Sequence, residues 1–254
     1  MSELKVKDRD IVAPGEELAV GMDFIPAKGA YRLGESIYAQ ELGLVQIDGR
    51  AIKLVPVSGA YVPKVDDTII VKIIDITMSG WRADTRSAYS GMIGLKDGSK
   101  DFIQRGADLS KYFSIEDYAV AKVIQVTSQK LVDLSVNGPG LRKLRGGQIF
   151  EIGCKKVPRV IGKQGSMVSM IKDMTGCFIT VGQNGRVWVN GNPKAQVLAI
   201  ETIKKIANEA HTSGLTDKIK AYLEQRVTEL GIELPLEESY EKPTDIDDRK
   251  EEDD

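Results

Sequence analysis

Two glycines enclose a lysine and a glutamine in the segment Gly162-Lys163-Gln164-Gly165. A loop of this kind can hold a phosphate group, because glycine lets the phosphate approach the main chain and lysine supplies positive charge. If a helix starts directly after the loop, its first N–H groups add further donors. The same glycine spacing recurs at Gly91/Gly94 and Gly182/Gly185, so only the surrounding sequence can single out one of the three.

The surroundings of residues 162–165 predict two helices with the loop between them. Upstream, "VPRVIG" favours a short helix, since Pro158 suits a first helical turn. Downstream, apolar residues at i, i+3, i+4 and i+7 share one helix face: Met167, Met170, Ile171 and Met174. Further basic residues flank the loop and are candidate phosphate contacts: Lys155, Lys156 and Arg159. The alternative interpretation is a turn between two helices that binds nothing.

Strands and further helices are expected on both sides of this helix pair. The strand "QIFEIG" precedes it, and the strands "CFITVG" and "RVWVNG" follow, joined by the turn Gln183-Asn184-Gly185. The glycine pair at 182 and 185 is therefore interpreted as a structural hairpin. Asn192 is predicted to cap a long helix that starts at Pro193. A last amphipathic helix, "GLTDKIKAYLEQRVTELG", is expected to pack onto the same unit.

The segment from about residue 61 to 145 predicts a small barrel. Five strands are expected, with a helical or loop insertion after the third, which is typical of a partly open Greek-key barrel. Gly91/Gly94 falls in the third strand, so this glycine pair is interpreted as structural. The ending "LSVNGPGLRKLRGG" is rich in glycine and is predicted to be a linker.

Barrels of this type bind single strands through aromatic stacking and basic loops. Trp81 lies beside a predicted turn, where an exposed ring could stack on a base, although a lone tryptophan is more often part of a core. The candidate RNA-binding residues of the barrel interleave basic and aromatic types: Trp81, Arg82, Arg86, Tyr89, Lys96, Lys122 and Lys130.

Residues 1–60 predict a small all-β module without recognisable chemistry. Short β-type runs are separated by glycine and proline, and Asp48-Gly49 between two apolar runs is a strong hairpin signal. Because small β-modules offer edge strands and loops to partners, docking is the expected role.

Composition and charge favour an intracellular protein whose main body is basic. The net charge is −2, but residues 237–254 hold ten carboxylates against three basic side chains, so residues 1–236 carry 32 basic against 27 acidic residues. The acidic end is predicted to be disordered and to aid solubility, or alternatively to compete with RNA for basic surfaces. No membrane span or signal peptide is expected, and Cys154 and Cys177 are predicted to be free thiols in a cytoplasmic protein.

Catalytic chemistry has little support in the sequence. The single histidine is His211, and Asp75, Asp84 and Asp133 show no spacing typical of a metal site. We therefore expect a protein that is not an enzyme and that needs no cofactor or metal.

The order strand, helix, GxxG, helix, strand, strand, helix resembles the KH domain of type I topology, βααββα. The match covers "VIGKQGSMVSMIKDMTGCFI", and in KH domains the GxxG loop clamps the backbone of about four nucleotides. A β-module, a barrel similar to that of ribosomal protein S-one and one KH domain, in this order, resemble the RNA-binding cap subunits of the archaeal exosome. Further similar stretches are "VAPGE", "LSVNGPGL", "KKVPRVIGKQGSM" and "HTSGLTDKIK".

This resemblance implies a multidomain chain: an all-β domain at 1–60, a five-stranded OB-fold barrel at 61–145, an α+β KH domain with a C-terminal helix at 146–232, and an acidic tail at 233–254. It further implies a non-catalytic subunit that binds single-stranded RNA and feeds it into a hexameric ring of RNase PH-like subunits. Three cap copies per ring are implied, alone or together with a second cap protein, with the N-terminal module docked on the ring. The resemblance also implies that neighbouring domains can partly cover the GxxG loop.

One alternative is a transcription elongation or termination factor with OB and KH domains, although those KH domains come in pairs and use the other topology. Polynucleotide phosphorylase also combines the two domain types. It places KH before the barrel and adds large catalytic domains that this chain does not match.

Overall fold

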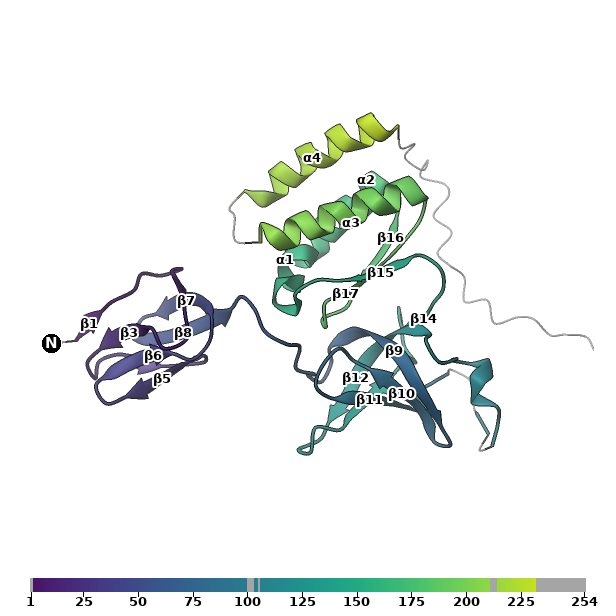
Figure 1. Cartoon of the computed structure of the whole chain (residues 1–254), viewed down its shortest axis with the longest axis horizontal. Helices are drawn as coiled ribbons and strands as arrows, with labels where there is room; N and C mark the ends of the chain where they lie inside the picture. The colour runs from purple at the N-terminus through teal and green to yellow at the C-terminus, as the bar shows by residue number, and fades with distance from the viewer. Residues whose placement is uncertain (1, 100–102, 105, 211–213, 232–254) are drawn as a thin grey trace, which may run out of the picture.

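The computed structural model describes residues 2–99, 103–104, 106–210 and 214–231, and Figure 1 shows three folded units along the chain. An all-β module stands apart at one end, and the KH unit lies over a barrel (Figure 1). The predicted acidic tail lies outside the described residues. No helix in the described part of the chain has the length and apolar character needed to cross a membrane.

The N-terminal module consists of two four-stranded sheets, with strand orders β1-β3-β6-β5 and β2-β7-β8-β4. Its strands are β1 (Glu3–Leu4), β2 (Ile11–Val12), β3 (Glu17–Val20), β4 (Ile25–Pro26), β5 (Ala30–Leu33), β6 (Ser36–Ala39), β7 (Gly43–Asp48) and β8 (Ala51–Pro56). Leu18, Ile37 and Ile52 are fully buried in its core. The predicted hairpin is confirmed, since β7 pairs with β8 across a turn in which Gly49 has a φ of 60°.

A five-stranded barrel follows, as the sequence predicted, and it is closed where a partly open barrel was expected. Its strands are β9 (Thr68–Thr77), β10 (Gly80–Asp84), β11 (Ser90–Gly94), β12 (Tyr118–Val126) and β13 (Val132–Ser135), with the short helix η1 (Leu109–Lys111) after the third. Pairing runs β13-β11-β10-β9-β12, and a further β12–β13 pairing closes the ring. A side chain at Gly91 would overlap Leu134, so this glycine is structural, as predicted. The predicted linker contributes β14 (Arg142–Leu144), which pairs with β12.

The KH unit has the predicted order of elements. They are β15 (Gln148–Glu151), η2 (Cys154–Lys156), α1 (Val157–Ile161), η3 (Lys163–Gly165), α2 (Ser166–Thr175), β16 (Phe178–Val181), β17 (Arg186–Asn190), α3 (Pro193–Asn208) and α4 (Leu215–Leu230). The antiparallel sheet has the order β15-β17-β16. Asn192 caps α3, accepting a bond from the Lys194 N–H at 3.1 Å. The helix α4 packs on the unit through Leu215, Ile219 and Leu223, as expected.

The barrel and the KH unit share an apolar interface. On β9, Ile69, Val71 and Ile73 face the barrel interior, whereas Ile70 belongs to a separate buried cluster with Val120, Leu144 and Trp188. The strand is therefore buried on both faces, because the KH sheet covers its outer side with Trp188. This packing fixes the two units against each other.

Candidate nucleic-acid interface

The loop at residues 162–165 has a backbone conformation that requires glycine. Gly162 has a φ of 77° and a ψ of 175°, a region that side chains rarely adopt. A Cβ at this position would lie 2.8 Å from both the Cβ and the main-chain nitrogen of Met167. Gln164 and Gly165 continue with φ values of 54° and 82°. The loop therefore turns sharply from α1 into α2.

The outer side of the loop is open. A Cβ at Gly165 would meet no atom within 4 Å. The helix α2 starts there without a side-chain cap and without an acidic residue in its first turn. Its amino end thus presents the positive end of the helix dipole and main-chain donors to an incoming anion.

Basic side chains surround this helix start. Lys163 and Lys155 are exposed, and Lys156 is half-buried in η2. No ion pair of these three lysines is found among the described residues. Arg159 is exposed on α1 and is engaged in an interaction of its own. The loop and its flank therefore combine open main chain with uncompensated positive charge.

The prediction that Trp81 offers an exposed stacking ring is wrong. Trp81 is fully buried in the barrel core, and its Nε1 donates to the Leu109 carbonyl at 3.2 Å. Its ring meets Phe113 edge-on, with 5.4 Å between the centroids. Gly98 lies so close to the ring that a Cβ there would come within 2.2 Å of it. The insertion between the third and fourth strands covers the tryptophan.

Arg86 is also removed from the predicted RNA-binding set. Its Nη1 donates to the Ile152 carbonyl at 2.7 Å and to the Asn184 carbonyl at 3.1 Å. Its Nε lies 3.1 Å from Glu151 Oε2. The guanidinium thus joins the barrel to the KH unit through Nη1 and Nε.

The other barrel candidates fall into two groups. Arg82 and Tyr89 are exposed. Arg82 Nε lies 3.4 Å from the Oγ of Ser90, the residue that follows Tyr89. Since β11 and β13 run parallel with Gly91 opposite Val132, the exposed Lys130 lies at the same end of the barrel as Tyr89. Lys96 follows the other end of β11, and Lys122 forms an ion pair with Asp66 at 2.8 Å. The structure brings together Arg82, Tyr89 and Lys130 and separates Lys96 and Lys122 from them.

The hairpin at Gln183-Asn184-Gly185 is structural, as predicted, but its contacts with the barrel were not foreseen. Asn184 is fully buried, and its Nδ2 donates to the Ile70 carbonyl at 2.7 Å and to the Thr85 carbonyl at 2.9 Å. The main-chain N–H of Gln183 donates to the Thr68 carbonyl at 2.9 Å. The turn therefore extends the barrel's hydrogen bonding into the KH unit. The apolar run Ile69-Ile70-Val71 was the available signal, since it indicates a strand buried on both faces.

Arg186 completes this contact from the KH side. It is only 6% exposed; its Nη2 pairs with the Asp84 carboxylate, and its Nε lies 3.4 Å from Glu151 Oε1. Burial alone raises the pKa of the Asp84 carboxyl, but the hydrogen bonds from Arg186 and from the Arg86 N–H outweigh it, so this pKa lies below its ordinary value. Asp84 thus stays ionised near neutral pH and holds the interface, a structural role.

The described residues contain no group of three or more histidine, cysteine, aspartate or glutamate side chains able to hold a metal ion. His211 lies outside them. Cys154 and Cys177 are free thiols, and Cys154 Sγ donates to the Gly59 carbonyl at 3.2 Å. The geometry thus offers binding surfaces, and the open GxxG loop is the strongest of them.

Comparison with known proteins gives a consistent result. A KH domain family model matches residues 147–195. Exosome complex component Rrp4 of Thermococcus kodakarensis is 42% identical over 242 residues, which cover 94% of this chain and 94% of the relative. Rrp4 of Methanothermus fervidus is 41% identical over 221 residues, 87% of this chain and 97% of the relative.

A crystal structure provisionally assigned as an exosome complex RNA-binding protein matches with a TM-score of 0.62 and 32% identity. The match covers 68% of this chain and 99% of that one. Sequence similarity along nearly the whole length, together with this shared structure, shows that the chain belongs to the family of the exosome complex component Rrp4.

Proposed function

We propose that this protein is a non-catalytic RNA-binding subunit of an exosome, which caps a ring of RNase subunits and delivers single-stranded RNA for 3'-to-5' degradation and processing. The observation that carries the proposal is the open GxxG loop at the start of α2, with its glycine-only backbone and its free lysines. The family membership supports the same role, since its members are named as components of that complex. The alternative, a transcription elongation or termination factor, gains no support from these relatives.

The loop would hold the RNA backbone, and the barrel would add contacts to the same strand. Phosphates can approach Gly165 because nothing fills the space above it. Lys163, Lys155 and Lys156 would add charge-assisted contacts, which make binding depend on salt concentration. On the barrel, Tyr89 offers a partly exposed ring between Arg82 and Lys130, a combination typical of single-strand binding.

Replacing Gly165 with aspartate should weaken RNA binding about tenfold or more, because a negative charge enters the space that a phosphate would occupy. The matched control is Gly165→Ala, which shares the strained φ of 82° without the charge. The measurement is the fluorescence anisotropy of a labelled unstructured RNA at low salt. Equal affinities of the aspartate and alanine variants would show that this loop is not the main contact.

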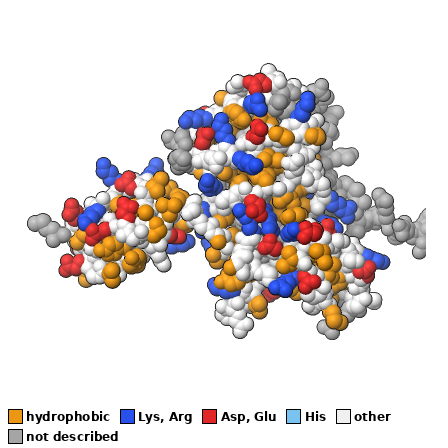
Figure 2. All heavy atoms as spheres, viewed as in Figure 1, with side chains coloured by type: hydrophobic (Ala, Val, Ile, Leu, Met, Phe, Trp, Pro, Cys, Tyr) orange, Lys and Arg blue, Asp and Glu red, His pale blue; other side chains and the backbone are white. Residues whose placement is uncertain are grey.

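The N-terminal module is proposed to dock on the hexameric RNase PH-like ring, with three cap copies per ring. Several large apolar side chains of the module are exposed, among them Ile25 and Leu33 at 58% and 66%. Figure 2 shows hydrophobic side chains spread over much of the visible face of this module. Exposed apolar surface of this kind is typical of protein interfaces.

A chain carrying both Ile25→Asp and Leu33→Asp should no longer co-elute with the ring, because docking would bury unpaired carboxylates. Met78→Asp is the control, since Met78 is 97% exposed at the tip of the β9–β10 hairpin, away from this module. Size-exclusion chromatography of the mixed subunits gives the readout. Unchanged co-elution of the double variant would remove the module from the docking surface.

We also place the protein in the cytoplasm, where its two free thiols are stable. Recovery of the chain with membranes after cell fractionation would contradict this placement.

A further inference from the structure

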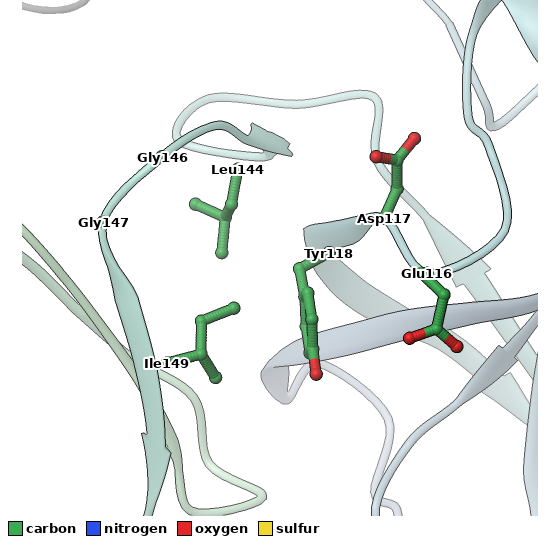
Figure 3. A pocket seen from close by; sticks show the side chains of 7 residues that line it. All are labelled: Glu116, Asp117, Tyr118, Leu144, Gly146, Gly147 and Ile149. Carbon is green, nitrogen blue, oxygen red and sulfur yellow. The ribbon is translucent and has the colours of Figure 1, made fainter.

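An open pocket of about 410 Å³ lies at the junction of the barrel and the KH unit (Figure 3). Three segments line it: residues 116–118 at the start of β12, the linker residues Leu144, Gly146 and Gly147, and Ile149 on β15. None of these residues belongs to the GxxG loop or to the barrel surface of Arg82, Tyr89 and Lys130. Its volume falls in the range of pockets that take small molecules, which is large enough for a nucleobase.

One part of the pocket wall is apolar and firmly held. The ring of Tyr118 lies opposite the side chains of Leu144 and Ile149 (Figure 3), and all three belong to the apolar cluster between the two units. Strand pairing of Tyr118 with Leu144 fixes their positions. The Arg186 guanidinium lies 5.9 Å from the centroid of the Tyr118 ring and supports it. A flat ring at the mouth of the pocket would meet the Tyr118 ring and the neighbouring aliphatic side chains.

Two carboxylates border the pocket, and each already has a lysine partner. Glu116 pairs through Oε2 with Lys72 at 2.5 Å, and Asp117 pairs through Oδ2 with Lys143. No bond to Glu116 Oε1 or Asp117 Oδ1 is recorded among the described residues, so each group keeps an acceptor oxygen. Because the lysines offset the charge, the pocket has little net attraction for a cation and little repulsion toward a nucleic acid.

A basic residue adjoins the lining residues of this pocket in the sequence. Arg145 lies between the lining residues Leu144 and Gly146, is exposed, and has no recorded partner in the described part of the chain. Gly146 and Gly147 follow with φ values of 62° and 73°, and both are exposed. The linker therefore carries an exposed arginine between two residues that line the pocket.

We propose that this pocket takes one unpaired nucleobase with an exocyclic amino group from an RNA strand held by the protein. The base would stack on Tyr118, donate its amino group to the carboxylate of Glu116, and leave its phosphate to Arg145. Cytosine presents such an amino group, whereas uracil presents a carbonyl oxygen at the same position. The inference rests on the proposed RNA-binding function, because the strand must be bound for its base to enter.

The test compares labelled oligo(C) and oligo(U) of equal length, whose affinities for the full chain are measured by fluorescence anisotropy. The wild type should bind oligo(C) more tightly, and Glu116→Gln should lower the ratio of the two affinities about fivefold. Arg145→Ala should weaken the binding of both oligomers about threefold. It should also lower the slope of log affinity against log salt concentration by about one, which corresponds to one phosphate contact, and the ratio of the two affinities should stay unchanged. The matched controls are Glu224→Gln and Lys218→Ala on the exposed side of α4, which should change nothing.

Both test positions are exposed, so the variants should keep the wild-type denaturation midpoint. A wild type that binds neither oligomer would remove the proposed function itself. Binding with a ratio that Glu116→Gln leaves unchanged would overturn the pocket alone and leave the proposed function standing. Free CMP and unlabelled oligo(C) are also compared as competitors of labelled oligo(C). If both displaced it at the same concentration, the pocket would be a nucleotide site instead of a strand contact.

Discussion

Replacing Trp81 with alanine is expected to lower the free energy of unfolding by about 3–5 kcal/mol. The ring is fully buried, packs edge-on against Phe113, and donates a hydrogen bond to the Leu109 carbonyl. Alanine would leave a cavity in the barrel and a carbonyl without its donor. Urea denaturation followed by circular dichroism gives the measurement.

Arg82→Ala is the control for this change, since Arg82 is adjacent in sequence and exposed. The free energy of unfolding of the Arg82→Ala variant should differ from that of the wild type by less than about 0.5 kcal/mol. Trp81→Phe separates packing from RNA stacking, because it keeps an aromatic ring in the core. Its RNA affinity should equal that of the wild type; a clear loss of affinity in a stably folded Trp81→Phe chain would contradict a purely structural role.

Asn184→Ala should lower the free energy of unfolding by about 2–4 kcal/mol, because it removes the donor to two buried carbonyls, those of Ile70 and Thr85. These bonds join the KH hairpin to the barrel. The variant should therefore loosen the interface, and its unfolding should separate into two transitions as the two units lose their coupling. Chemical denaturation monitored by tryptophan fluorescence is suitable, since Trp81 lies in the barrel and Trp188 in the KH unit.

Gln183→Ala, one residue earlier in the same turn, is the matched control. Gln183 contacts the barrel through its main-chain N–H, which the substitution keeps. We expect its stability to stay within about 0.5 kcal/mol of the wild type. If Asn184→Ala were as stable as Gln183→Ala, the buried amide would not be what holds the two units together.

Local sequence patterns were sufficient for most of the secondary structure. The i, i+3, i+4, i+7 spacing of Met167, Met170, Ile171 and Met174 predicts α2, and Gly176 ends it with a φ of 65°. Asn192 before Pro193 predicts the cap of α3, and Asp48-Gly49 predicts the β7–β8 hairpin. These features depend on residues close together in the chain, so a single sequence contains the information.

Side-chain roles at the barrel surface were harder to predict. Trp81 and Arg86 share the aromatic and basic character of RNA-binding residues, yet one fills the core and the other holds the KH unit. Their sequence neighbours do not reveal this, because Trp81 is covered by a segment near Leu109 and Arg86 meets residues 66 and 98 positions away. Arg82 and Tyr89, with the same chemistry, remain exposed.

The sequence by itself determined the order of the three folds, the GxxG loop between two helices and the resemblance to exosome cap subunits. Periodicity, turn residues and caps act over a few residues, and they specify each unit without knowledge of the others. Only the tertiary structure decided which face of the barrel the KH sheet covers, through contacts such as Asn184 to Ile70, 114 residues apart. That packing determines which basic and aromatic side chains stay exposed, and it forms the pocket beside Tyr118, because burial depends on distant partners that no local pattern encodes.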